Sequence, residues 1–270
     1  MILLLAAALA APGCRGKATR SGSAVPPKAP ARALSVSVLA DPVLAEPLGA
    51  VAKLLKKRDG TELRLSFLDS TAQAQLKPDT APAADVLIFA DHGVLSPLVK
   101  AGVVDEASAC VFAGDRLTLV GKRGMGWRTE TLFDTYRLRF KKLGLADSKT
   151  VLGAYCDEAL KSDGAYKHVK DRLKYYRATP DLAQALAKDE VQLAMAYAST
   201  AAQDPQMEVA LLVGADLHED IRYRAVARAG RSADRGVQEF LRLLCEDQEV
   251  QAALGGFGLA DRETALTDVR

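Results

Sequence analysis

Short apolar runs and amphipathic stretches alternate along the chain from Leu34 onward. Residues 65–67 alternate between apolar and polar side chains like a half-buried strand, which ends at residues 69–71. Residues 72–76 read as the start of a helix, and the Pro-punctuated segment 81–91 leads into a continuous apolar strand typical of parallel sheets. This alternation at short spacing predicts an α/β fold of mainly parallel sheets flanked by helices.

Ser70 is the first candidate for ligand contact, because it follows a strand and begins a helix. The N–H groups at a helix N-terminus have no partner within the helix, and the helix dipole favours negative charge there. The position therefore suits a small anion, although a serine at a helix start can also act simply as an N-cap.

The N-terminus carries the features of an export signal, which we place at residues 1–13. Ile2 to Ala11 is wholly apolar but far shorter than the ~20 residues that a membrane-spanning helix needs. Small residues precede Cys14, which resembles the acylated first residue of a bacterial lipoprotein; the alternative is an ordinary signal peptide with Cys14 incidental. Residues 14–33 are rich in Ser, Pro, Gly and basic side chains, so we expect a disordered tether that favours an anionic lipid surface.

Charge and cysteine usage exclude several classes of protein. The 36 Lys and Arg and 34 Asp and Glu give a net charge of +2, but the basic surplus lies in the tether, so no nucleic-acid-binding face is expected. The 3 histidines show no metal-ligand spacing, and we expect no metal and no cofactor. Apart from Cys14, the cysteines are predicted to be buried apolar side chains, with one disulfide as the alternative: Cys110, Cys156 and Cys245.

The segment Ala81-Pro82-Ala83-Ala84-Asp85-Val86-Leu87-Ile88-Phe89-Ala90-Asp91 resembles the periplasmic molybdate-binding receptors of ABC importers. These receptors typically have a Ser-rich turn followed by Ala-Pro-Ala-Asp-Val-Phe-Ile-Ser-Ala-Asp at this place. The resemblance extends over roughly residues 34–260, and its other carriers are the strand and helix at 34–55, the helix at 94–105, the crossover strand at 112–117 and Gly256-Phe257-Gly258.

The resemblance implies a monomeric, two-lobed, type II periplasmic binding protein. Lobe 1 would consist of residues 34–113 and 222–270, and lobe 2 of residues 114–221, with the ligand in the cleft between them. The implied ligand is molybdate, tungstate or a similar tetrahedral oxyanion, and the implied partner is the membrane permease of an ABC importer. The implied location is periplasmic, with a membrane anchor through lipidated Cys14.

The family binds its oxyanion with two serines, a tyrosine and backbone amides, and four positions here match. Ser70 stands at the second serine, and Tyr197 ends an apolar strand at the place of the tyrosine. Leu152 and Leu182 occupy the places of the two amide donors, which tolerate a change of side chain.

The first serine of the family is replaced by Val43. Loss of a hydroxyl donor to a charged ligand costs roughly 1.5–3 kcal/mol. Asp41-Pro42 reads as an N-cap carboxylate followed by proline in the first helical turn, and Asp69 adds a second carboxylate beside Ser70. Two carboxylates near the site repel an anion unless both point outward as surface caps, which is the arrangement we expect.

Three classes of function follow from these observations. The first is an oxyanion receptor, and the second is a receptor of the same fold that has changed or lost its ligand, serving another solute, a cation or amine, or a partner protein. The third is an enzyme, which we do not expect, because the chain contains no P-loop, GxSxG elbow or paired-carboxylate motif.

Overall fold

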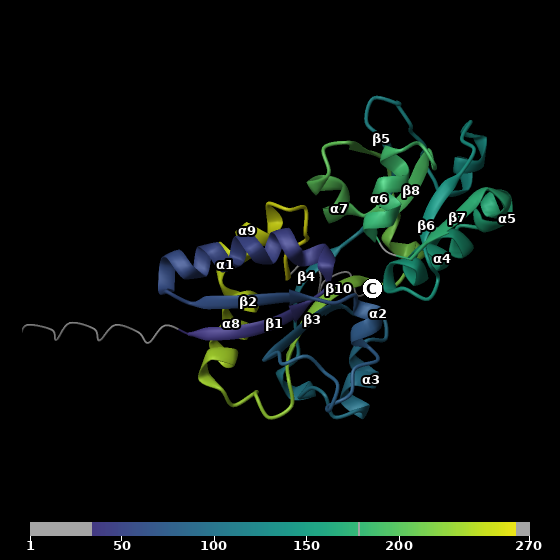
Figure 1. Ribbon diagram of the computed structural model, residues 1–270. Helices are drawn as coiled ribbons and strands as arrows, with labels where there is room; N and C mark the ends of the chain where they lie inside the picture. Colours follow the sequence, from purple (N-terminus) through teal and green to yellow (C-terminus); the bar gives the residue numbers. More distant parts are fainter. Residues whose placement is uncertain (1–33, 178, 263–270) are drawn as a thin grey trace, which may run out of the picture. The chain divides into compact units, whose positions relative to one another are not determined.

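The computed structural model describes residues 34–177 and 179–262, which belong to the second of two compact units, Ala33–Arg270 (Figure 1). The predicted signal peptide (1–13), Cys14 and the predicted tether (14–33) lie outside the described residues.

Two five-stranded sheets form the framework, with strand orders β2-β1-β3-β10-β4 and β7-β6-β8-β5-β9. The strands of the first sheet are β1 (Ser35–Ala40), β2 (Glu62–Phe67), β3 (Val86–Ala90), β4 (Cys110–Asp115) and β10 (Ile221–Ala227). Those of the second are β5 (Leu117–Lys122), β6 (Leu143–Ala146), β7 (Leu173–Tyr176), β8 (Leu193–Tyr197) and β9 (Met207–Leu212). In each sheet one strand, β10 or β5, runs antiparallel to both of its neighbours.

Helices connect these strands, as the alternating pattern predicts. The α-helices are α1 (Ala45–Asp59), α2 (Ser70–Gln73), α3 (Leu95–Lys100), α4 (Val151–Ser162), α5 (Tyr166–Val169), α6 (Thr179–Ala187), α7 (Ala198–Gln203), α8 (Arg235–Glu246) and α9 (Gln248–Gly255). Short 3-10 helices lie at Pro42–Leu44, Glu106–Ser108, Phe133–Arg137, Lys170–Arg172 and Ala215–Leu217. The two-lobed α/β prediction is confirmed, and lobe 1 and lobe 2 below denote the parts built on the first and second sheets.

The strands β3 and β8 are the central strands of the two sheets. Every residue of both strands is buried, as expected of continuous apolar runs in the interior of a sheet. The chain passes from the first sheet to the second between β4 and β5 and returns between β9 and β10. The residue limits predicted for the two lobes stay a prediction, because residues 33–270 cluster as one unit.

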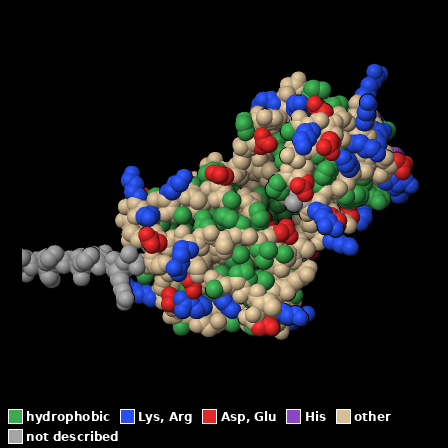
Figure 2. Space-filling model, in the orientation of Figure 1, with side chains coloured by type: hydrophobic (Ala, Val, Ile, Leu, Met, Phe, Trp, Pro, Cys, Tyr) green, Lys and Arg blue, Asp and Glu red, His purple; other side chains and the backbone are tan. Residues whose placement is uncertain are grey.

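A disulfide joins Cys110 of β4 to Cys245 of α8. For these two cysteines the prediction of buried free side chains is wrong, and the alternative of one disulfide is correct. For Cys156, which is free and buried, the prediction is confirmed. The disulfide links a segment that precedes lobe 2 to one that follows it, and disulfides persist in oxidising compartments. On the outer surface, acidic and basic side chains are interspersed over the face in view (Figure 2).

Candidate functional site

The carboxyl ends of β1, β2 and β3 bring three segments of lobe 1 together. The three strands run parallel, with Ala40 in register with both Phe67 and Ile88, so their ends meet at one edge of the sheet. Asp41 follows β1 directly, and its N–H donates to the Ile88 carbonyl at 2.9 Å. Ser70 begins the helix that follows β2, and because β2 is the neighbour of β1, Ser70 lies beside Asp41 at this edge of the sheet.

The carboxylate of Asp41 accepts hydrogen bonds from donor groups at this edge of the sheet. Its Oδ1 accepts from the Val43 N–H at 3.0 Å, and its Oδ2 accepts from the Ser70 N–H at 2.9 Å and from the Ser70 hydroxyl. The Ser70 hydroxyl oxygen in turn accepts from the Ala90 N–H at 3.1 Å. The donors that the sequence assigned to an oxyanion are thus bound to a carboxylate of the protein itself.

This arrangement corrects two expectations about the carboxylates and the helix start. Asp41 caps the first 3-10 helix, as predicted, but its side chain points inward to Ser70 rather than outward. Asp69, not Ser70, is the N-cap of α2: it accepts from the Thr71 N–H at 2.8 Å and is exposed. Asp41 therefore faces the site, and Asp69, although exposed, lies beside it.

Burial raises the pKa of Asp41, although the hydrogen bonds from Ser70 and Val43 lower it and the charge of Asp69 raises it further. Loss of water around a carboxylate disfavours its charged form, and a second negative charge nearby acts in the same direction. The site therefore holds a carboxylate whose charge a positively charged neighbour would stabilise.

The N-terminus of α4 forms the opposing part of the site in lobe 2. Thr150 is the N-cap, and its hydroxyl accepts from the Gly153 N–H at 3.1 Å. The Val151 N–H donates at 3.1 Å to the Thr71 hydroxyl of lobe 1. The Leu152 N–H lies in the same first turn, where amides have no partner within the helix. The Leu152 backbone is thus placed as a donor, and its contact with a ligand stays a prediction.

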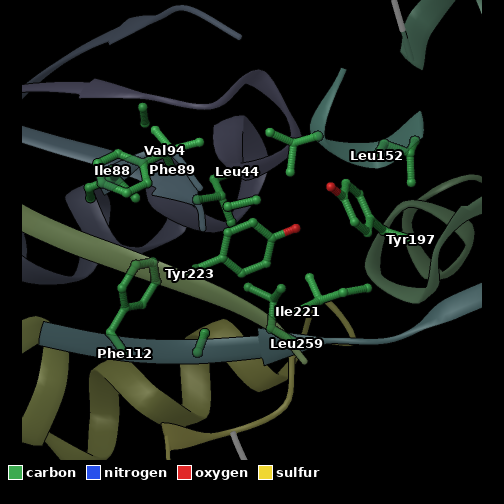
Figure 3. Close-up of a cluster of buried hydrophobic side chains, with 14 of the residues drawn as sticks. Leu44, Ile88, Phe89, Val94, Phe112, Leu152, Tyr197, Ile221, Tyr223 and Leu259 are labelled. Carbon is green, nitrogen blue, oxygen red and sulfur yellow. The ribbon is translucent and has the colours of Figure 1, made fainter. Parts of the chain in front are cut away.

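Tyr197 ends β8 and is only 4% exposed. Its ring packs against Tyr223 of β10, with ring centroids 6.3 Å apart and planes at 67°. Figure 3 shows the two hydroxyl oxygens directed into the space between the rings. The Tyr223 hydroxyl donates to Asp115 at 3.1 Å, whereas that of Tyr197 has no hydrogen-bond partner within residues 34–177 and 179–262. Burial raises the pKa of Tyr197, so its hydroxyl stays a neutral donor.

A small cavity of about 20 Å³ lies between these groups, with room for about one water molecule. Its lining comes from both lobes: Asp41, Asp69, Ala146, Thr150, Val151, Leu152, Arg177, Thr179 and Tyr197. Of the five residues predicted to bind ligand, Leu152 and Tyr197 line the cavity directly. Ser70 and Val43 lie behind Asp41 and reach the cavity only through that carboxylate.

Leu182 does not line the cavity. The helix α6 begins at Thr179, so Leu182 lies beyond its first residues, and its side chain is buried in the core of lobe 2. Seven lining residues were not among the predicted ligand contacts: Asp41, Asp69, Ala146, Thr150, Val151, Arg177 and Thr179. Thr150 and Thr179 each precede or begin a helix, which is a recognisable N-cap signal.

Where the chain first crosses between lobes, Asp115 anchors a second buried network. Its carboxylate accepts from the N–H groups of Arg116 at 2.8 Å and Ser199 at 3.1 Å, and from the Ser199 and Tyr223 hydroxyls. Burial raises the pKa of Asp115 to about 6, although the hydrogen bond from Ser199 lowers it. Asp115 thereby ties the end of β4 to α7 of lobe 2.

Within the part of the chain that the structure describes, no cluster of three or more His, Cys, Asp or Glu side chains is placed to hold a metal ion. In the same part, no helix combines the length and the apolar character needed to cross a bilayer.

The fold is shared with solved periplasmic receptors. The chain is similar to the substrate-binding domain of a putative molybdenum ABC transporter from Clostridium difficile, with 17% identity, a TM-score of 0.71, and 84% of this chain and 98% of that chain covered. It is similar to the periplasmic molybdate-binding protein of Azotobacter vinelandii, with 14% identity, a TM-score of 0.70, and 83% and 98% covered. It is also similar to the sulfate-binding protein of Mycobacterium tuberculosis, with 17% identity, a TM-score of 0.68, and 86% and 88% covered.

These likenesses show that the chain shares the two-lobed fold of type II periplasmic binding proteins. Residues 36–260 match the family described as bacterial extracellular solute-binding protein, and the chain belongs to that family. No curated protein matches the chain. The family description implies a solute as the ligand of this chain.

Proposed function

We propose that this protein is the solute-capturing receptor of an ABC importer whose cleft takes a small amine rather than molybdate or tungstate. The observation that carries the proposal is the Asp41 carboxylate, which is bonded to the Ser70 and Val43 donors that an oxyanion would need. A tetrahedral dianion entering the cavity would meet two carboxylates, Asp41 and Asp69, against one guanidinium, Arg177.

The same groups suit a ligand that carries N–H donors and positive charge. A carboxylate has about four acceptor sites, of which Asp41 uses three within the protein and Asp69 uses one. The free sites can accept from an ammonium group. The positive charge of the ligand would also stabilise the charged form of Asp41, and this would offset the effect of burial, which raises its pKa.

The lobe 2 part of the site suits an acceptor atom on the same ligand. The Tyr197 hydroxyl and the Leu152 N–H are donors that the described residues leave available in the cavity. A small solute with an amine at one end and a carbonyl or hydroxyl oxygen at the other would satisfy both halves. Its size is limited by the cavity unless the lobes open around it, which is the usual hinge motion of such receptors.

The setting of this function is extracytoplasmic. The family and the Cys110–Cys245 disulfide support a location in an oxidising compartment. We propose in addition that Cys14 is acylated after removal of residues 1–13, and that residues 14–33 tether the receptor to the membrane near its permease. The receptor is proposed to act as a monomer.

An oxyanion receptor is the second candidate. Tyr197 and Leu152, two of the positions that match the molybdate-binding family, line the cavity with unpartnered donors. For this candidate the Asp41 side chain would have to rotate away or take up a proton, so binding would strengthen as the pH falls.

A thermal-shift and calorimetric screen of the full chain with Cys14→Ser tests the two candidates. The panel contains primary amines, amino acids and polyamines on one side, and molybdate, tungstate, sulfate and phosphate on the other. Binding to the folded state raises stability by about 2.7 kcal/mol at a hundredfold excess over the Kd. A shift with an amine that Asp41→Ala abolishes supports the proposal; a shift with molybdate at neutral pH contradicts it.

A further inference from the structure

A second, larger cavity, of about 800 Å³, lies in lobe 1 away from the ligand site. The ligand site is built at the carboxyl ends of β1 and β2, whereas this cavity includes the first residues of β1, residues just before β3 and just after β10, and extends along β2 as far as Ser66. We call it the basic cavity, and it is lined by Ser35, Ser37, Arg64, Leu65, Ser66, Ala83, Ala84, Asp85, Arg228, Ala229 and Arg231.

The basic cavity exists because one face of β1 and β2 carries polar side chains at this end. Ser37 and Arg64 are in register on neighbouring parallel strands, so their side chains project on the same face. Val36, on the opposite face, is fully buried beside Gly236 of α8. Mainly parallel sheets usually have both faces covered by helices, so packing alone does not account for an exposed polar face here.

Positive charge predominates in the lining, with three arginines against one carboxylate, Asp85. Arg231 forms an ion pair with Asp85 at 2.8 Å. Arg228 donates to the carbonyls of Pro78 and Pro82, and because carbonyls are neutral, the charge of Arg228 stays uncompensated. Arg64 is exposed and has no partner among residues 34–177 and 179–262. Two guanidinium charges therefore remain for a ligand with negative charge.

The chain enters the described structure beside this cavity, since Ser35, the first residue of β1, is part of the lining. Residues 15–33 separate this point from Cys14. If Cys14 is acylated, a bilayer lies within the reach of that segment, roughly 20–25 Å for a random coil of about this length. Anionic headgroups attract basic side chains close to a membrane surface.

We propose that the basic cavity is a docking site for the phosphate headgroups of an anionic membrane. Guanidinium groups bind phosphate oxygens through paired N–H donors. The docked lobe would rest on the bilayer by the amino ends of its strands. The solute cleft, at the carboxyl ends, would stay free, so the docking goes beyond the proposed solute binding and does not depend on the identity of the solute.

Vesicle binding tests the proposal with the full chain carrying Cys14→Ser, so that no lipid anchor contributes. Co-sedimentation with vesicles of phosphatidylglycerol and phosphatidylcholine is compared with vesicles of phosphatidylcholine alone. Arg64→Gln removes the unpartnered charge of the cavity, and Arg139→Gln removes an exposed charge from lobe 2 as the matched control. We expect Arg64→Gln to weaken partition into anionic vesicles about fivefold. Arg139→Gln should change it less than about twofold.

Three results would overturn the inference. Equal losses from the two variants would mean that general charge, including that of the basic N-terminal segment, accounts for the binding. Absence of wild-type binding to anionic vesicles would remove the docking site altogether. A thermal shift with inorganic phosphate that Arg64→Gln abolishes would assign the cavity to a soluble anion instead. None of these results bears on solute capture, which the ligand screen tests separately.

Discussion

Replacing Asp41 by alanine should convert the cleft from one that rejects oxyanions into one that binds them. In the wild-type protein this carboxylate accepts from the N–H groups of Val43 at 3.0 Å and Ser70 at 2.9 Å, and from the Ser70 hydroxyl. Alanine frees all three donors and removes one negative charge from the cavity. These donors then face the same space as the unpartnered hydroxyl of Tyr197.

The expected gain follows from the strength of hydrogen bonds to charged groups, about 1.5–3 kcal/mol each. If two of the three freed donors engage molybdate, the gain is about 3–6 kcal/mol, a factor of about 10² to 10⁴ in Kd. Loss of the N-cap should lower the free energy of unfolding by about 1 kcal/mol, so the Asp41→Ala protein should stay folded.

Isothermal titration with molybdate at pH 7 measures this gain, with thermal melts as a check on folding. Asp69→Ala is the matched control, because it removes the same charge from the same cavity but frees only the Thr71 N–H. We expect at least about a hundredfold tighter binding for Asp41→Ala than for the wild type. The control should gain less than about tenfold. Equal binding of molybdate by the two variants, or weaker binding by Asp41→Ala than by the wild type, would show that Asp41 does not block the oxyanion.

Three further predictions concern the tyrosine, the disulfide and the buried acid. Tyr197→Phe should weaken solute binding about tenfold in calorimetry. It should leave the melting temperature unchanged, because the hydroxyl has no partner among the described residues. Tyr223→Phe should instead lower the free energy of unfolding by about 1–3 kcal/mol, because it removes the hydrogen bond to Asp115. Cys245→Ser opens a link between residues 135 apart in sequence and should lower the unfolding free energy by up to about 5 kcal/mol in urea melts. Dithiothreitol should reduce the wild type to the same stability and leave the variant unaffected; an unchanged wild type would argue against the disulfide. The pKa of Asp115 in the folded protein, about 6, lies above the ordinary value of 3.8, so the folded state binds the proton more tightly than the unfolded state. The free energy of unfolding should therefore fall by about 3 kcal/mol as the pH rises from about 4 to 6. Asp115→Asn should lack this loss, and an identical pH profile for the two proteins would contradict the assignment.

The sequence pattern predicted the fold and several element boundaries because these depend on local order. Tyr197 lies at the end of an apolar strand, as the run of buried residues indicated. Asp41-Pro42 forms a helix start with the expected N-cap hydrogen bond. Each of these features is fixed by neighbours in the sequence, through alternation, capping or proline geometry.

The features that sequence reasoning missed depend on contacts between distant segments. Asp41 points inward because Ser70, 29 residues away, offers it two donors at the adjoining strand end. The direction of a capping side chain cannot be derived from the cap motif alone. Cys110 and Cys245 meet only once the chain has returned from lobe 2, and Leu182 lies past the amide-donating turn because α6 begins already at Thr179.

We propose that the Asp41 carboxylate occupies the place that an anion takes in related receptors. Anomalous diffraction at the molybdenum absorption edge, from crystals grown at neutral pH and soaked in molybdate, tests it most directly. We expect no molybdenum peak between Ser70 and Tyr197, and electron density in which the Asp41 carboxylate stays bonded to the Ser70 hydroxyl. A molybdenum peak at that position, with Asp41 turned away, would show instead that the site is open to an oxyanion.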